Sequence, residues 1–85
     1  MNPVLIYTTT YCPYCRQAKE LLKRKGVAFT EQDVTEDDDE RERLTARTGQ
    51  RTVPQIFIGE THVGGFSDLD ALERAGKLDA LLGKG

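Results

Sequence analysis

The 85-residue sequence has no tryptophan, only two cysteines, and no long apolar run. Two neighbouring cysteines exclude the disulfide scaffold of small secreted domains, which spaces several pairs along the chain. The longest apolar run, Val4 to Ile6 followed by Tyr7, is far too short to cross a membrane. No charged segment followed by an apolar stretch opens the chain, so a secretory signal is not expected, although a leader already removed would leave no trace. We therefore expect a cytoplasmic protein with no membrane attachment.

An excess of basic charge is also missing, since the net charge is −2. This balance argues against a nucleic acid or an anionic membrane as a partner. Seven acidic side chains lie between residues 33 and 42, and a basic stretch follows the second cysteine. The acidic stretch could be a docking face, but a solvated helix start is the commoner explanation. A chain of this length has room for one core, so we expect a single domain over residues 1–85.

The order of apolar patterns and turn signals predicts a β-α-β-α-β-β-α arrangement. The expected strands cover residues 3–8, 27–32, 55–58 and 61–63. The expected helices run from 13 to 25, from a capping box at 35–38 to 48, from a cap at Ser67 to 75, and over a last turn at 78–82. This order predicts an α/β fold, a central sheet with helices on both faces, and the first strand–helix–strand unit calls for a parallel pair.

Two of the expected helices differ in the apolar face that they offer to the sheet. The first has an inward stripe of Ala18, Leu21 and Leu22. The second has Leu44 and Ala46 at best. We expect the first helix to cover the larger part of the core.

Cys12-Pro13-Tyr14-Cys15 stands between the first strand and the first helix. If Cys12 is the helix N-cap and Pro13 the first helical residue, the Cys12 sulfur lies next to the unpaired N–H of Cys15. Unpaired amides and the positive end of the helix dipole favour a thiolate over a thiol. Cys15, one turn later, can attack a mixed disulfide formed at Cys12. Position therefore predicts Cys12 as the nucleophile and Cys15 as the resolving thiol.

Other uses of the two cysteines are weaker hypotheses. A structural zinc site wants four ligands, and the further candidate, His62, lies in a predicted hairpin, so no metal is expected. A purely structural disulfide closing so short a loop would contribute little, and it would not need a helix N-cap.

Three motifs together resemble the dithiol class of the glutaredoxin family: Cys12-Pro13-Tyr14-Cys15, Thr52-Val53-Pro54 and Gly64-Gly65-Phe66-Ser67-Asp68. The resemblance covers essentially the whole chain. It implies a thioredoxin fold with a four-stranded mixed sheet, and glutathione as the electron donor. It also implies glutathione–protein mixed disulfides and protein disulfides as substrates, with ribonucleotide reductase among the possible protein partners. We expect a monomer.

The resemblance also implies a set of glutathione-binding residues: Tyr14, Arg51, Thr52, Val53, Pro54, Gly65, Ser67 and Asp68. The resemblance implies a cis peptide bond before Pro54, which would turn the Val53 backbone toward the cysteines, where it could pair with the ligand like a strand. The start of a helix at Gly65 suits a carboxylate, and the Asp68 carboxylate suits an ammonium group. Ser67 and Asp68 could instead simply cap that helix.

The remaining contacts come from a ring and a basic side chain. The Tyr14 ring could pack against the bound tripeptide, and Arg51 matches the basic position that pairs with its glycine carboxylate, with Gln55 as the alternative. An arginine in a turn is more often only solvated.

One position departs from the family pattern, because Thr9 stands where a lysine is common before the first cysteine. We expect the Cys12 thiolate to depend mainly on the helix terminus, with some help from nearby basic side chains. An iron–sulfur cluster shared by two chains is disfavoured, because Pro13 stiffens the loop and Cys15 competes as a resolving thiol. A thioredoxin reduced by a flavoprotein is disfavoured by the absence of tryptophan.

Overall fold

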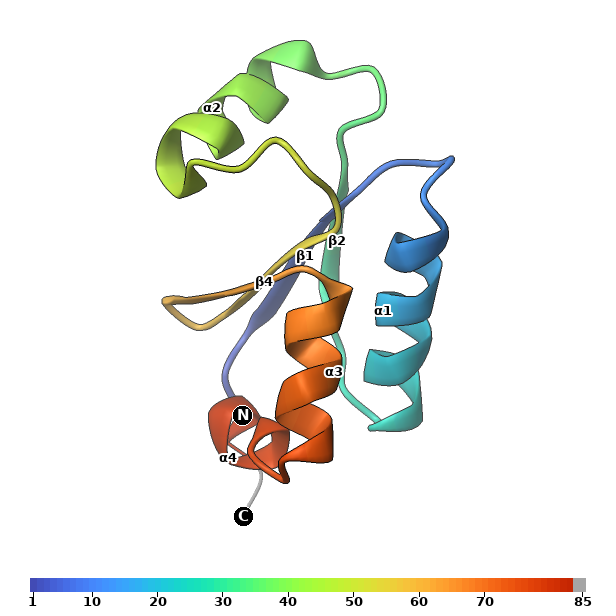
Figure 1. Cartoon of the computed structure of the whole chain (residues 1–85), viewed down its shortest axis with the longest axis vertical. Helices are drawn as coiled ribbons and strands as arrows, with labels where there is room; N and C mark the ends of the chain where they lie inside the picture. The colour runs from blue at the N-terminus through green and yellow to red at the C-terminus, as the bar shows by residue number, and fades with distance from the viewer. Residues whose placement is uncertain (84–85) are drawn as a thin grey trace.

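The computed structural model describes residues 1–83, and within them it contains four strands and four helices (Figure 1). In chain order they are β1 Val4–Thr8, α1 Pro13–Arg24, β2 Thr30–Asp33, α2 Asp38–Thr48, β3 Gln55–Ile58, β4 Thr61–Gly64, α3 Phe66–Arg74 and α4 Leu78–Leu82. The strands form one mixed sheet in the order β2-β1-β3-β4. β1 pairs parallel with β2 and antiparallel with β3, and β3 pairs antiparallel with β4. The predicted α/β fold and its parallel first pair are confirmed.

The sheet separates two hydrophobic cores, because successive residues of a strand point to opposite faces. The larger core joins β1 and β3 to α1, α3 and α4, through Ile6, Ile56, Leu22, Leu69 and Leu78 among others. The predicted stripe of Ala18, Leu21 and Leu22 is buried in it. Helices therefore cover both faces of the sheet (Figure 1).

The smaller core lies on the α2 side of the sheet and consists of Tyr7, Val34, Leu44 and Phe57. Leu44 is the buried residue of α2, whereas Ala46 is exposed, so the prediction of an inward-facing Ala46 was wrong. A buried leucine contributes about 1.5–3 kcal/mol. The packing of α2 on the sheet therefore depends on few side chains.

The second strand starts later than predicted, at Thr30 instead of Val27. Gly26 has a φ of +71°, its N–H donates to the Lys23 carbonyl at 2.9 Å, and the Val27 N–H donates to the Leu22 carbonyl at 3.0 Å. These two bonds form the Schellman motif that ends α1. Val27 is thus buried as part of the helix end and does not pair in the sheet.

Two helix starts also differ from prediction. The N-cap of α2 is Asp37 and not Thr35, since an Asp37 carboxylate oxygen accepts a bond from the Glu40 N–H at 3.1 Å. The N-cap of α3 is Gly65 and not Ser67, and β4 extends to Gly64. The cap of α2 therefore lies two residues after the predicted one, and the cap of α3 lies two residues before the predicted one.

The two ends of the described chain are joined on the side of α4. The Asn2 backbone N–H donates to the Leu82 carbonyl, and the Asn2 side-chain amide donates to the Leu81 carbonyl, each at 2.8 Å. Lys25 Nζ, just after α1, lies 2.8 Å from carboxylate oxygens of both Glu73 and Asp79. The last helical turns are therefore held to the N-terminus and to α1.

None of the helices within residues 1–83 has the length and apolar character needed to cross a membrane.

Candidate active site

Cys12 is the N-cap of α1, as predicted, and Pro13 is the first helical residue. The Cys15 N–H donates to Cys12 Sγ at 3.2 Å. An extended backbone at Cys12, with φ of −100°, lets the side chain turn back over the helix start. The sulfur therefore receives a backbone amide and lies at the positive end of the helix dipole.

The two cysteines are both reduced, but their surroundings differ. Cys12 is 8% exposed and Cys15 is 1% exposed. Burial and the bond with Cys12 raise the pKa of Cys15 to about 12. A thiol held in this way stays protonated at neutral pH. Cys12 is therefore the sulfur that an incoming disulfide reaches first.

The loop before β3 lies against the reactive sulfur. The Val53–Pro54 peptide bond is cis, which confirms the prediction. The Cys12 thiol donates to the Val53 carbonyl oxygen, with Sγ and oxygen 3.6 Å apart. The Val53 carbonyl and the nucleophilic Cys12 sulfur therefore lie at the same edge of the site.

A cleft of about 240 Å³ opens beside this loop. Its lining residues come from the start of α1, the loop before β3 and the start of α3: Tyr14, Thr52, Val53, Pro54, Gly65, Phe66 and Ser67. The structure thus brings together six of the eight residues predicted to bind glutathione. Tyr14 is 59% exposed, as expected of a ring outside the core.

The seventh lining residue, Phe66, was not predicted as a site residue. Its ring stacks on that of Tyr14, with centroids 6.4 Å apart and planes at 24°. Phe66 stands inside the Gly64–Asp68 motif, so the sequence signal existed. Prediction used the neighbouring amides and side chains of that motif and overlooked the ring.

Arg51 and Asp68 lie outside this cleft. Arg51 lines a separate hollow with four residues that all belong to α2: Asp38, Arg41, Glu42 and Thr45. An Asp68 carboxylate oxygen accepts a bond from the Gly65 N–H at 3.0 Å, so Asp68 closes the start of α3. The helix-capping alternative is therefore observed for Asp68, and its outer carboxylate surface remains exposed.

Arg41 joins the two loops that carry the site, which no local motif predicts. Its guanidinium donates to the Tyr11 hydroxyl at 3.3 Å and to the Arg51 carbonyl at 3.5 Å. Tyr11 directly precedes Cys12, and Arg51 directly precedes Thr52. One side chain on α2 thereby connects the loop of the nucleophile with the loop of the cis proline.

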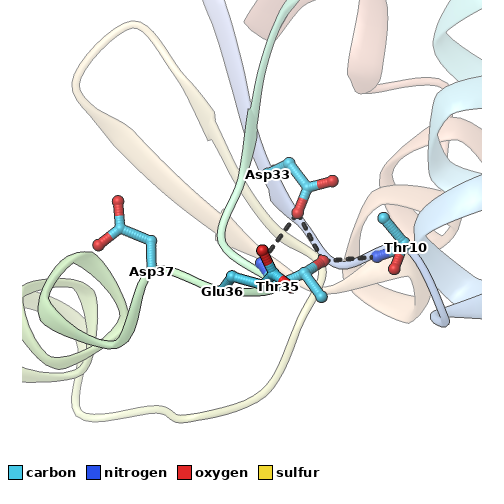
Figure 2. A pocket seen from close by; sticks show the side chains of 5 residues that line it. All are labelled: Thr10, Asp33, Thr35, Glu36 and Asp37. Carbon is cyan, nitrogen blue, oxygen red and sulfur yellow. Dashed lines mark hydrogen bonds between the residues drawn. The ribbon is translucent and has the colours of Figure 1, made fainter.

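A larger hollow of about 580 Å³ lies next to the Cys12 loop and is acidic (Figure 2). Thr35 Oγ1 donates to Asp33 at 2.6 Å and accepts a bond from the Thr10 N–H at 2.9 Å. The bonds that Asp33 accepts from the Thr35 hydroxyl and the Thr35 N–H lower the pKa of Asp33. Glu36 and Asp37 complete the lining, and no sulfur is present. The bond between Thr10 and Thr35 in this hollow fixes the loop before Cys12, but the hollow is not where the thiol chemistry occurs.

Thr9, at the position where a lysine is common, is buried at 5% exposure. Its hydroxyl has no hydrogen-bond partner among the residues that the structure describes. Among residues 1–83, no three His, Cys, Asp or Glu side chains are grouped so that they could hold a metal ion.

A C-x-x-C pair at the start of the first helix, next to a cis-proline loop in a fold built on a four-stranded mixed sheet, defines a thiol–disulfide oxidoreductase with a thioredoxin fold. The chain belongs to the glutaredoxin family, whose model matches residues 4–63. Glutaredoxins are glutathione-dependent disulfide oxidoreductases.

Individual relatives agree with this assignment. A glutaredoxin of Pseudomonas aeruginosa is 62% identical over 82 residues, which cover 96% of this chain and 98% of the relative. Glutaredoxin 3 of Escherichia coli K12 is 50% identical and covers 96% of this chain and 99% of its own. A buckwheat glutaredoxin–glutathione complex superimposes with a TM-score of 0.91 at 35% identity, over 98% of this chain and 78% of that chain.

Proposed function

We propose that residues 1–85 form a single, monomeric glutaredoxin domain of the cytoplasm, in which Cys12 is the nucleophile and Cys15 the resolving thiol. Its substrates are glutathione–protein mixed disulfides and protein disulfides. The observation that carries the proposal is the Cys15 N–H bond to Cys12 Sγ beside an open cleft, with the second sulfur buried behind the first. Ribonucleotide reductase stays a prediction among protein partners.

In the monothiol branch, the Cys12 thiolate attacks the glutathione sulfur of a mixed disulfide. The old S–S bond breaks, the substrate protein leaves as a thiolate that takes up a proton, and Cys12 carries glutathione. A second glutathione, as its thiolate, attacks this glutathione sulfur. Oxidised glutathione leaves and the Cys12 thiolate is restored. In both attacks the thiolate is the nucleophilic form of the sulfur, so these steps assign no separate general base.

In the dithiol branch, Cys12 attacks one sulfur of a protein disulfide and releases the other as a thiol. Cys15 then loses its proton and attacks Cys12 Sγ, which frees the second substrate sulfur and closes the Cys12–Cys15 disulfide. Two glutathiones reduce that disulfide and leave as oxidised glutathione. The glutaredoxin couple lies at roughly −200 to −230 mV, within reach of the glutathione pool.

For the bound tripeptide, we propose that Thr52 and the Val53 backbone pair with its cysteine portion, beside Pro54. The stacked Tyr14 and Phe66 rings supply the apolar wall of the cleft. The complex of the similar buckwheat glutaredoxin with glutathione supports glutathione as the ligand.

The charged groups of glutathione need partners of opposite polarity, and we place these partners at and near the start of α3. We assign the γ-glutamyl carboxylate to the start of α3, where Gly65 and Ser67 line the cleft. Its ammonium is assigned to the exposed Asp68 carboxylate. Arg51 stays a prediction for the glycine carboxylate, because it directly precedes Thr52, which lines the cleft.

The first test is NADPH consumption with glutathione, glutathione reductase and a glutathionylated peptide, for the wild type, Cys15→Ser and Cys12→Ser. We expect turnover in the wild type and Cys15→Ser and none in Cys12→Ser. Loss of turnover in all three, with electrons accepted from a thioredoxin-type reductase instead, would contradict the proposal.

The ligand assignment has its own test, in the KM for glutathione. Asp68→Asn removes the proposed partner of the ammonium group. Asp70→Asn is the control, because Asp70 lies on the same helix and its carboxylate pairs with Arg74 at 2.8 Å. We expect the KM to rise in Asp68→Asn and to stay within error in Asp70→Asn. Equal KM values in the two variants would remove Asp68 from the binding site.

A further inference from the structure

A lysine and a carboxylate lie behind the buried cysteine and take no part in the steps above. Lys19 is on α1, and its Nζ lies 3.0 Å from Glu31 Oε2 on β2. The same oxygen accepts a bond from Thr8 Oγ1 at 2.6 Å. Thr8 is 1% exposed, so the carboxylate is fixed from inside the sheet. The ammonium is thus held in one place, with its side chain only 26% exposed.

Lys19 shares a helix face with Cys15, because residues four apart lie one above the other. Of the other cations of α1, Arg16 is next to Cys15 in the chain but is exposed. Lys23 is one turn beyond Lys19, so it lies about 12 Å along the axis from Cys15, at 1.5 Å per residue, and it is exposed.

Cys15 faces an electrostatic difficulty in the dithiol branch, since it must ionise before it attacks. Burial and Cys12 raise the pKa of Cys15, whereas a bond from the Thr9 backbone N–H and the charge of Lys19 lower it. The other charged groups that interact with Lys19 are the carboxylates of Glu31 and Asp33 on β2. Within residues 1–83, Lys19 is the cation whose charge lowers the pKa of Cys15, and it lies four residues from Cys15 on α1.

We propose that Lys19 is a positioning residue for the dithiol branch: its ammonium, held by Glu31 and Thr8, favours the Cys15 thiolate at the step in which Cys15 attacks Cys12 Sγ. The inference rests on the proposed role of Cys15 as the resolving thiol. In this step the Cys15 proton passes to solvent, the Cys12–Cys15 bond forms, and the bond from Cys12 to the substrate sulfur breaks. The substrate sulfur leaves with the electron pair and is protonated.

A purely structural ion pair between α1 and β2 would give the same contacts, and two isosteric variants separate the explanations. If the pair only fastens the helix to the strand, Lys19→Gln and Glu31→Gln have the same effect. If the charge of Lys19 matters, they differ, because the amide oxygen in Glu31→Gln can still accept a bond from Lys19 Nζ, whereas the neutralising negative charge is gone.

The experiment measures the ratio of protein-disulfide turnover to glutathionylated-peptide turnover under the same glutathione supply. We expect Lys19→Gln to lower this ratio about three-fold, since the charge acts through partly solvated surroundings. Lys19→Arg and the matched control Lys23→Gln keep the wild-type ratio, and Glu31→Gln keeps or raises it. Equal losses in Lys19→Gln and Glu31→Gln would overturn the proposal.

A second readout follows the alkylation of Cys15 against pH in a Cys12→Ser background. Loss of the Lys19 charge moves the profile to higher pH, and an unmoved profile also overturns the proposal. Cys15→Ser distinguishes the two levels of inference. If it retains protein-disulfide turnover, the resolving role itself fails, whereas if it loses that turnover and Lys19→Gln does not change the ratio, only the role of Lys19 fails.

Discussion

Gly64, the last residue of β4, has a φ of +112°, a conformation that side chains rarely adopt. A Cβ built on Gly64 would meet the Asp68 carboxylate, which accepts the Gly65 N–H. A Gly64→Ala substitution therefore strains the backbone and pushes away the carboxylate that closes the start of α3. Gly65→Ala is the matched control, because its Cβ lies 3.6 Å from the Pro54 carbonyl oxygen, an ordinary contact, and its φ is −93°.

The magnitude follows from two contributions. A non-glycine residue held at such a φ costs about 1–3 kcal/mol, and +112° lies outside the left-handed well, so we take about 2–3 kcal/mol. Loss of the exposed Asp68 bond adds about 0.5–1 kcal/mol. The sum of about 3 kcal/mol corresponds to a fall in Tm of about 12–24 °C for a domain of this size. Alanine at the N-cap position of Gly65 costs under about 1 kcal/mol.

Urea unfolding of both variants, followed by far-UV circular dichroism, gives the two free energies of unfolding directly. We expect Gly64→Ala to lose at least about 2 kcal/mol more than Gly65→Ala. Equal losses in the two variants would refute the reasoning, because both substitutions add the same methyl group to adjacent residues.

Two further predictions concern the sheet edge behind the cysteines. Thr9→Val removes a buried hydroxyl that has no partner among the described residues, so it should raise the free energy of unfolding by about 1 kcal/mol. Thr8→Val breaks the bond to Glu31 and should lower the free energy of unfolding by about 1–2 kcal/mol. Urea midpoints that move in the same direction in the two variants would contradict this pair of predictions. The bond from Thr8, and next the ion pair with Lys19, lower the pKa of Glu31 below 4.5. The ionised Glu31 therefore stabilises the fold above the pKa of the unfolded chain, and this contribution is lost as the pH falls through the folded value. Between pH 5 and pH 3 the urea midpoint should fall more steeply in the wild type than in Glu31→Gln, and parallel curves would exclude the contribution.

Local chemistry made the nucleophile predictable from sequence. A cysteine followed by proline at the start of an apolar helical pattern fixes an N-cap, and the cap places the Cys15 N–H on Cys12 Sγ. The cis bond before Pro54 was predicted from the family resemblance and not from the residues alone, because most such bonds are trans.

Competition between neighbouring acceptors explains the shifted helix starts. Thr35 had the sequence of a cap, but Asp33 and the Thr10 N–H engage its hydroxyl, so Asp37 caps α2 instead. In the same way, Gly65 starts α3 because the Asp68 carboxylate reaches back to its N–H. The start of α3 is set within three residues, whereas the start of α2 depends on Thr10, which lies far from Thr35 in the chain and outside any local pattern.

The contacts across the site were harder to predict for the same reason. Arg41 reaches Tyr11 and Arg51 only because the smaller core seats α2 over the sheet. The placement of Arg51 in a hollow beside α2, and not in the cleft, likewise depends on contacts between separate segments. No spacing rule within one segment encodes these distances.

The bonds between Asn2 and the last turn of α4 also determine where a linker or label can be attached to the protein. In Figure 1 the start of β1 and α4 lie at one end of the long axis, and α1 begins nearer the other. An electrode linker or a fluorescent reporter attached beyond Asn2 would therefore leave Cys12 facing away from the support. Because Asn2 and Leu82 are hydrogen-bonded, the chain also suits circular permutation, with the two ends linked and new termini placed at the Gly59–Glu60 turn. Such a permutant would leave the segments around Cys12 unchanged.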